Sequence, residues 1–113
     1  MHEMTLMESV RGIVLEAKRH QSFQRVVRVV LQIGQLSGVQ EEAMRFCFDI
    51  VMEGSPAEGA VLEIEEIPGK AWCKRCEVEV DMPSRLDPCP SCGGMPGRIT
   101  QGMEMCVKGL EVE

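Results

Sequence analysis

The sequence reads WCKRC at residues 72–76 and CPSCGG at residues 89–94. Each segment holds two cysteines separated by two residues, and twelve residues lie between the two pairs. This spacing is typical of a zinc site, because each short turn directs two thiolates toward one tetrahedral ion. The four predicted ligands are Cys73, Cys76, Cys89 and Cys92. Since cysteine fills all four positions, no place remains for a reactive water, and we expect structural rather than catalytic zinc.

The segment around these cysteines, from about residue 69 to residue 101, has few apolar side chains. They are too few to hold roughly thirty residues against the loss of conformational entropy. Structural zinc sites supply apparent binding energies of roughly 10 to 16 kcal/mol, which is enough to make up the difference. We therefore expect this segment to depend on its metal.

Two alternatives to zinc are a pair of disulfides and a redox-active cysteine pair. A redox pair normally opens a helix that follows a strand. Here residues 77–80 alternate Glu and Val, as a strand does, and Pro88 and Pro90 flank the second pair. The surrounding sequence therefore favours zinc over a thiol oxidoreductase.

Charge limits the partners of the chain. The formal net charge of its 113 residues is −6, and residues 1–69 carry six Lys or Arg against eleven Asp or Glu. Residues 70–108 are near neutral, with six basic and five acidic residues and Trp72 as their single aromatic side chain. Nucleic-acid binding needs a basic surface and often stacking aromatics. A zinc ribbon that contacts nucleic acid or another protein, with no other metal, is the alternative function, and we expect no nucleic-acid partner.

Targeting and catalytic motifs are missing from the sequence. Its start has no apolar stretch typical of a signal peptide, and no apolar run reaches membrane-spanning length. We therefore expect a cytoplasmic protein with no membrane partner, a location in which cysteines stay reduced. The sequence also has no Ser-His-acid set and no phosphate-binding loop, so we expect no enzymatic activity.

Hydrophobic periodicity predicts an α+β fold with two helices packed on a small three-stranded sheet and an inserted zinc-ribbon module. The helices are expected at 5–20 and 40–52, and the strands at 25–33, 60–67 and 103–113. The last strand should rejoin the first part of the chain. The predicted domains are therefore residues 1–69 completed by 103–113, and a zinc-ribbon module at 70–102.

Each predicted helix has an apolar face. The first helix is expected to bury Met4, Leu6, Met7, Val10, Ile13, Val14 and Ala17. The second is expected to bury Ala43, Phe46, Cys47, Ile50 and Val51. These residues recur at the spacing of one side of a helix.

The first three residues, Met1, His2 and Glu3, could surround a metal ion. The terminal amine, the amide nitrogens of His2 and Glu3, and the His2 imidazole are four nitrogens that can lie in one plane. Planar nitrogen sites favour Ni(II) or Cu(II). The alternative is a solvated histidine followed by an acid that the dipole of the first helix favours.

In addition to these motifs, the chain resembles the HypA/HybF family of hydrogenase nickel-incorporation proteins along nearly its whole length. The resemblance rests on Met1-His2-Glu3, the two cysteine pairs, the segment LQIG at 31–34, FCF at 46–48 and GLEV at 109–112. It implies a nickel metallochaperone with nickel at Met1, His2 and Glu3 and zinc at the four cysteines. It also implies delivery of Ni(II) to the large subunit of a [NiFe] hydrogenase, together with a HypB-type GTPase.

The sequence differs from some members of that family at the start of the second helix and next to the paired cysteines, where it has no histidine. Some members carry an acidic residue at the start of the second helix that assists the nickel site, whereas this chain has Gln40 there. We therefore do not include that position among the ligands. The oligomeric state, including a homodimer, stays open at this stage.

Overall fold

The computed structural model describes residues 3–113 and divides them into two compact units. The helical unit comprises Met1–Leu31, Val39–Glu65 and Cys106–Glu113. The cysteine unit comprises Gln32–Gly38 and Glu66–Met105. Neither helix in residues 3–113 combines the length and apolar character needed to cross a membrane.

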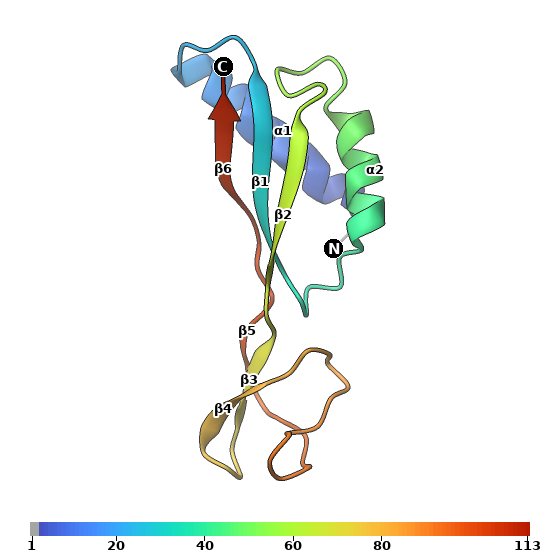
Figure 1. Ribbon diagram of the computed structural model, residues 1–113, viewed down its shortest axis with the longest axis vertical. Helices are drawn as coiled ribbons and strands as arrows, with labels where there is room; N and C mark the ends of the chain where they lie inside the picture. The colour runs from blue at the N-terminus through green and yellow to red at the C-terminus, as the bar shows by residue number, and fades with distance from the viewer. Residues whose placement is uncertain (1–2) are drawn as a thin grey trace. The chain divides into compact units, whose positions relative to one another are not determined.

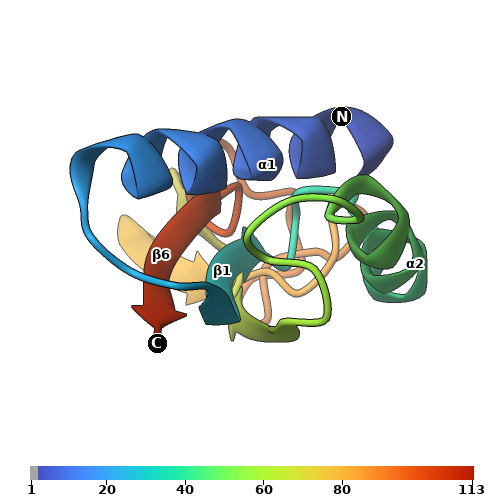
Figure 2. The same ribbon diagram turned by 90° about the horizontal axis from the view of Figure 1, so that it is seen from above.

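The helical unit contains two helices and most of a three-stranded sheet in the order β2-β1-β6. Along the chain the elements are α1 (Glu3–His20), β1 (Val26–Gly34), α2 (Glu41–Val51), β2 (Val61–Ile67) and β6 (Met105–Val112). In Figures 1 and 2, α1 lies across one face of this sheet and α2 lies beside β2. The predicted fold class, two helices on a small three-stranded sheet with a separate cysteine-bearing module, is confirmed.

Strands β1 and β6 are antiparallel, because the start of β1 is bonded near the end of β6 and the end of β1 near the start of β6. The backbone N–H of Gln24 donates to the carbonyl of Glu113, whereas the N–H of Gly34 donates to the carbonyl of Glu104. The C-terminal segment therefore pairs along β1, a strand that begins 79 positions before β6.

Strands β1 and β2 are parallel, because their hydrogen bonds advance in the same direction. Val26 N–H donates to Pro56 just before β2, and Gln35 N–H donates to Ile67 at its end. Parallel strands need a long connection, and α2 lies within it. The position of α2 beside the sheet follows from this crossover.

The core of the helical unit lies between the helices and the sheet. Its most deeply buried side chains are Leu6, Met7, Val10, Val14, Val26, Val29, Leu31, Met44, Phe48, Met52, Ala57 and Leu62. Three residues predicted to be buried are not: Ile13 is 46% exposed, Phe46 68% and Ile50 46%. In α2 the sequence allows two apolar rows, and the row that contains Met44 and Phe48 is the one that packs inward.

Helix α1 binds both ends of α2. At the beginning, the Glu3 carboxylate accepts a hydrogen bond of 3.0 Å from the backbone N–H of Gln40, the residue just before α2. At the end, the Arg11 guanidinium donates to the carbonyls of Val51 at 2.5 Å and Glu53 at 2.9 Å. An acid at the positive end of α2 and a base at its negative end match the helix dipole. The two helices therefore run in the same direction.

The cysteine unit is built on a second antiparallel sheet in the order β4-β3-β5. Its strands are β3 (Lys70–Cys73), β4 (Val78–Asp81) and β5 (Ile99–Gln101). Two small clusters form its interior. One contains Leu36, Ala71 and Met82, with Ile99 packed against them. The other contains Val80 and the four cysteines of the two Cys-x-x-Cys segments.

Three glycines of the cysteine unit lie in close backbone contact. A Cβ at Gly34 would come within 2.0 Å of the carbonyl oxygen of Gly102, and a Cβ at Gly102 within 2.6 Å of the Cα of Gly69. Gly102 also has a φ of 109°, a conformation that side chains disfavour. Larger residues at these positions would push the backbones apart.

The domain ranges predicted from the sequence, 1–69 with 103–113 and 70–102, remain a proposal. They follow the positions of motifs, whereas the compact units follow the packing of residues. The compact units divide the chain within β1, β2 and β6, so each of these strands contributes residues to both. Packing also assigns Gln32–Gly38 to the cysteine unit, since Leu36 belongs to its core.

Candidate metal centre

Two turns with the same backbone hydrogen-bond pattern carry the four cysteines. In the first, the backbone N–H of Glu77 donates to the carbonyl of Cys73 at 2.8 Å. In the second, the N–H of Gly93 donates to the carbonyl of Cys89 at 2.9 Å. Glu77 and Gly93 each lie four positions after the first cysteine of their pair, and both have a positive φ, of 56° and 74°. Each turn thereby directs its two thiols to the same side.

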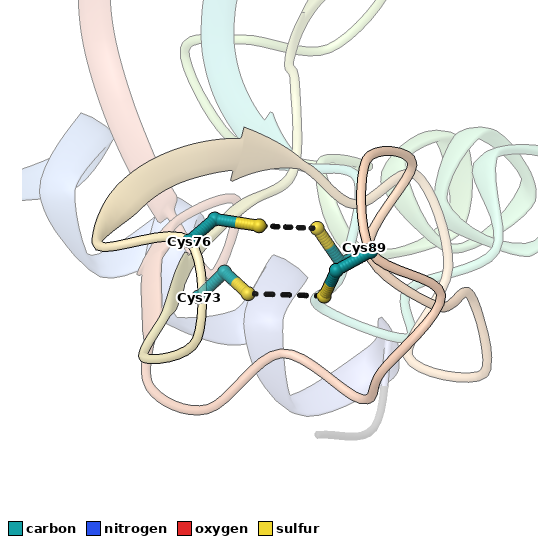
Figure 3. Close-up of side chains that lie close together, drawn as sticks. Cys73, Cys76 and Cys89 are labelled. Atoms are coloured by element: carbon teal, nitrogen blue, oxygen red, sulfur yellow. Dashed lines mark hydrogen bonds between the residues drawn. The ribbon is translucent and has the colours of Figure 1, made fainter.

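The four sulfur atoms converge on one point. All four Sγ atoms lie within 4.8 Å of one another, with 3.7 Å between Cys73 and Cys92 and 3.9 Å between Cys76 and Cys89 (Figure 3). A disulfide would bring its two sulfurs to about 2.05 Å. Four sulfurs at about 2.3 Å from a tetrahedral zinc ion are about 3.8 Å apart. The observed spacing therefore fits a metal held by four thiolates.

Burial agrees with a structural site. Cys73 is 2% exposed and Cys89 is 1% exposed, while Cys76 and Cys92 are half-buried. A site enclosed by four ligands binds its ion tightly and leaves no position for substrate. If zinc is bound, these four residues hold it and it stabilises the fold of the cysteine unit.

Two thiols of the cluster have pKa values shifted in opposite directions. Hydrogen bonding with Cys92 and burial raise the pKa of Cys76 to about 12. Backbone N–H groups of Cys92 and Ser91 lower the pKa of Cys89 to about 7. Without metal, Cys89 therefore loses its proton at a lower pH than Cys76. Because only thiolates bind zinc, metal binding must release protons.

The remaining two cysteines are not part of this group. Cys47 is buried on α2 in the helical unit, and Cys106 is exposed on β6. The structure brings together the four cysteines that the spacing predicted.

The predicted nickel ligands at the beginning of the chain are described only in part. Met1 and His2 lie outside the described residues. Glu3 is half-buried in the first turn of α1, and its carboxylate accepts the N–H of Gln40. The start of α1 is therefore tied to the start of α2.

Sequence reasoning missed two features of these sites. The positive φ of Glu77 is not indicated by its residue type, because glutamate rarely adopts this conformation. The equivalent position of Gly93 in the second turn could have indicated it. The bond from Gln40 to Glu3 joins residues 37 positions apart through a backbone group, so no residue-type pattern marks it.

Comparison with known proteins decides the family. The model of the family described as "Hydrogenase/urease nickel incorporation, metallochaperone, hypA" matches residues 1–112. The chain belongs to the HypA family. It is 50% identical to the hydrogenase maturation factor HypA of Paracoccus denitrificans, with 99% of each chain covered. It is 51% identical to the factor of the same name from Albidiferax ferrireducens, with both chains covered completely.

Solved structures support the same relationship. The fold matches the solution structure of the Ni metallochaperone HypA from Helicobacter pylori with a TM-score of 0.69 at 29% sequence identity. The match covers 99% of this chain and 97% of the other. A second solution structure of a HypA protein matches with a TM-score of 0.66 at 30% identity, covering 100% of this chain and 97% of that one. HypA-family membership therefore rests on both sequence and fold.

Proposed function

We propose that this protein binds Ni(II) at its N-terminus and delivers it to the large subunit during [NiFe] hydrogenase maturation, while zinc in the Cys73, Cys76, Cys89 and Cys92 site stabilises the fold. The observation that carries the proposal is the family match over residues 1–112. The protein acts as a carrier rather than an enzyme, and any GTP hydrolysis comes from a HypB-type partner. Reduced cysteines fit a cytoplasmic location.

The proposed nickel ligands are the amine of Met1, the amide nitrogens of His2 and Glu3, and the imidazole of His2. The bond from Gln40 to the Glu3 carboxylate supports a role for that carboxylate in holding the start of the chain beside α2. In this arrangement the amide nitrogen of Glu3 binds nickel, and its carboxylate accepts the hydrogen bond from Gln40.

The two sites suit two different tasks. A terminal chelate of histidine and amide nitrogens loses its ion when those nitrogens are protonated, so it can release its cargo. The closed sulfur site keeps its ion. One chain can therefore carry a transferable nickel ion beside a permanent zinc ion.

Nickel binding in three forms of the protein tests the proposal: the native chain, His2→Ala, and a chain extended by a tag before Met1. We expect isothermal titration calorimetry to show tight nickel binding by the native chain alone, because each alteration removes a nitrogen ligand. Zinc content and fold should stay unchanged in all three.

His20→Ala is the matched control, because His2 and His20 are the only histidines of the chain. His20 is exposed and bonded to Glu16 at 2.7 Å, so its removal should leave nickel affinity unchanged. Full nickel affinity in the tagged form would show that the amine of Met1 is not a ligand.

A further inference from the structure

Helix α2 has a second row of apolar side chains that is not buried in the core of the helical unit. Phe46 is 68% exposed and Ile50 46%, while Ala43 is half-buried. Positions 43, 46 and 50 are spaced so that they lie along one side of a helix. The buried row of α2, which contains Met44, Cys47 and Phe48, faces the core of the helical unit. We call Ala43, Phe46 and Ile50 the outer row of α2.

The outer row differs from scattered surface hydrophobics. On α1, Ile13 and Leu15 are also exposed, but residues two apart point to different sides of a helix and form no row. Burial of apolar side chains of this size against a partner is favourable. Two such side chains aligned on one helix therefore offer a partner a substantial apolar contact.

Acidic residues border the outer row. Glu42 and Asp49 are exposed and lie four positions before and three positions after Phe46, which places them next to it on the helix surface. Within residues 3–113, neither carboxylate forms an ion pair. The surface is therefore apolar along its middle and negatively charged at its border.

The only basic residue of α2, Arg45, lies beside Glu42 and Asp49 on the helix, but its guanidinium is bound elsewhere. Arg45 donates 2.7 Å to the backbone carbonyl of Leu62 on β2, and it pairs with Glu41 at 3.2 Å. The first of these bonds occupies a carbonyl on an edge strand of the sheet. It therefore disfavours the addition of a further strand there.

We propose that the outer row of α2 is the docking surface for an amphipathic helix of a partner protein, one that presents apolar side chains bordered by lysine or arginine. Charge complementarity selects this partner, because basic residues would pair with Glu42 and Asp49 while apolar ones cover Phe46 and Ile50. A second copy of this chain would instead bring the same acidic border against itself, in a protein whose net charge is already −6.

This inference rests on the proposed function, which supplies the protein to be tested as the source of that helix: the HypB-type GTPase. The experiment measures the dissociation constant of the full chain with purified GTPase by calorimetry at low and at moderate salt. Phe46→Ala should weaken binding roughly tenfold or more, since truncation of a central aromatic contact typically has such an effect. Because Phe46 is exposed, the helical circular dichroism should not change.

Two further variants make the test specific. Asp49→Lys should weaken binding and reduce its dependence on salt, because it replaces an attractive charge with a repulsive one. Leu86→Ala is the matched control: Leu86 is a large apolar side chain, 86% exposed, in the cysteine unit. Its truncation should change the dissociation constant by less than about twofold, because a residue outside the contact carries no binding energy.

Three results would overturn the inference. The first is binding by Phe46→Ala that equals native binding, and the second is a native chain that does not bind the GTPase. The third is a native dimer in sedimentation that Phe46→Ala dissociates, which would assign the surface to a second copy. Nickel titration of the same variants keeps the proposed function separate, because it should be unchanged whether or not the docking surface is correct.

Discussion

At the scale of single residues, the cysteine turns show how one backbone conformation is met by two different amino acids. Glu77 and Gly93 occupy equivalent positions, and both have a positive φ. Glycine adopts this conformation without strain, whereas a side chain there costs about 1 to 3 kcal/mol. The turn at Glu77 therefore carries strain that the turn at Gly93 does not.

Glu77→Gly should stabilise the protein by about 1 kcal/mol, because it removes this strain. Gly93→Ala should destabilise it by at least about 1 kcal/mol for the opposite reason. Urea denaturation followed by the fluorescence of Trp72 on β3 checks both values.

Gly94→Ala is the control for that pair. A Cβ at Gly94 would lie 3.6 Å from the Cys92 sulfur, an ordinary contact, and Gly94 has no positive φ. Equal losses from Gly93→Ala and Gly94→Ala would contradict the assignment of strain to the left-handed position.

At the scale of elements, α2 depends on α1 for hydrogen bonds at both of its ends. Gln40, the residue before α2, makes no capping bond with its own side chain, and the last turn of α2 contains no basic residue. Glu3 and Arg11 of α1 supply what α2 lacks. Helix ends without hydrogen-bond partners are destabilised, so the contacts from α1 should stabilise α2.

Arg11→Gln should lower the free energy of unfolding by about 1 to 2 kcal/mol, because charged hydrogen bonds to the carbonyls of Val51 and Glu53 are lost. Arg19→Gln is the control. Among residues 3–113 Arg19 forms only an exposed ion pair with Glu16, so this substitution should cost less than about 0.5 kcal/mol. Urea titrations followed at 222 nm measure both. Similar values for the two variants would argue against the role given to Arg11.

At the scale of the whole molecule, the two compact units differ in what holds them together. The helical unit has a continuous apolar core between its helices and sheet. The cysteine unit has two small clusters, one of which consists of the four cysteines and Val80. Metal binding therefore contributes far more to the second unit than to the first.

Removal of the proposed zinc ion with a chelator should unfold the four-cysteine site while the helical unit stays folded. The chain offers a separate signal for each unit: its single tryptophan, Trp72, lies in the cysteine unit, and both helices lie in the helical unit. We expect the tryptophan emission to shift to longer wavelength, because Trp72 becomes more solvated, while ellipticity at 222 nm is retained.

Cys73→Ser should reproduce the effect of the chelator, since it removes one ligand of the same site. Leu86→Ser, an exposed change in the same unit, should have no such effect. Loss of the 222 nm signal together with the tryptophan shift would mean that the two units unfold as one.

The sequence by itself determined which four cysteines come together, both helices and the three strands of the sheet β2-β1-β6. Two cysteine pairs at fixed spacing define a site, because each turn is local and the ion joins the turns. The positions of these helices and strands follow from periodicity, whereas β3 and β5 were not predicted. The predicted fold class is confirmed.

Only the tertiary structure decided which face of α2 is buried, since Met44 and Phe48 compete there with Phe46 and Ile50 at equivalent helical spacing. It also decided the strand order β2-β1-β6 and the two bonds by which α1 holds the ends of α2. The physical reason is that these features depend on groups distant in the chain, and often on backbone atoms, which every residue type shares.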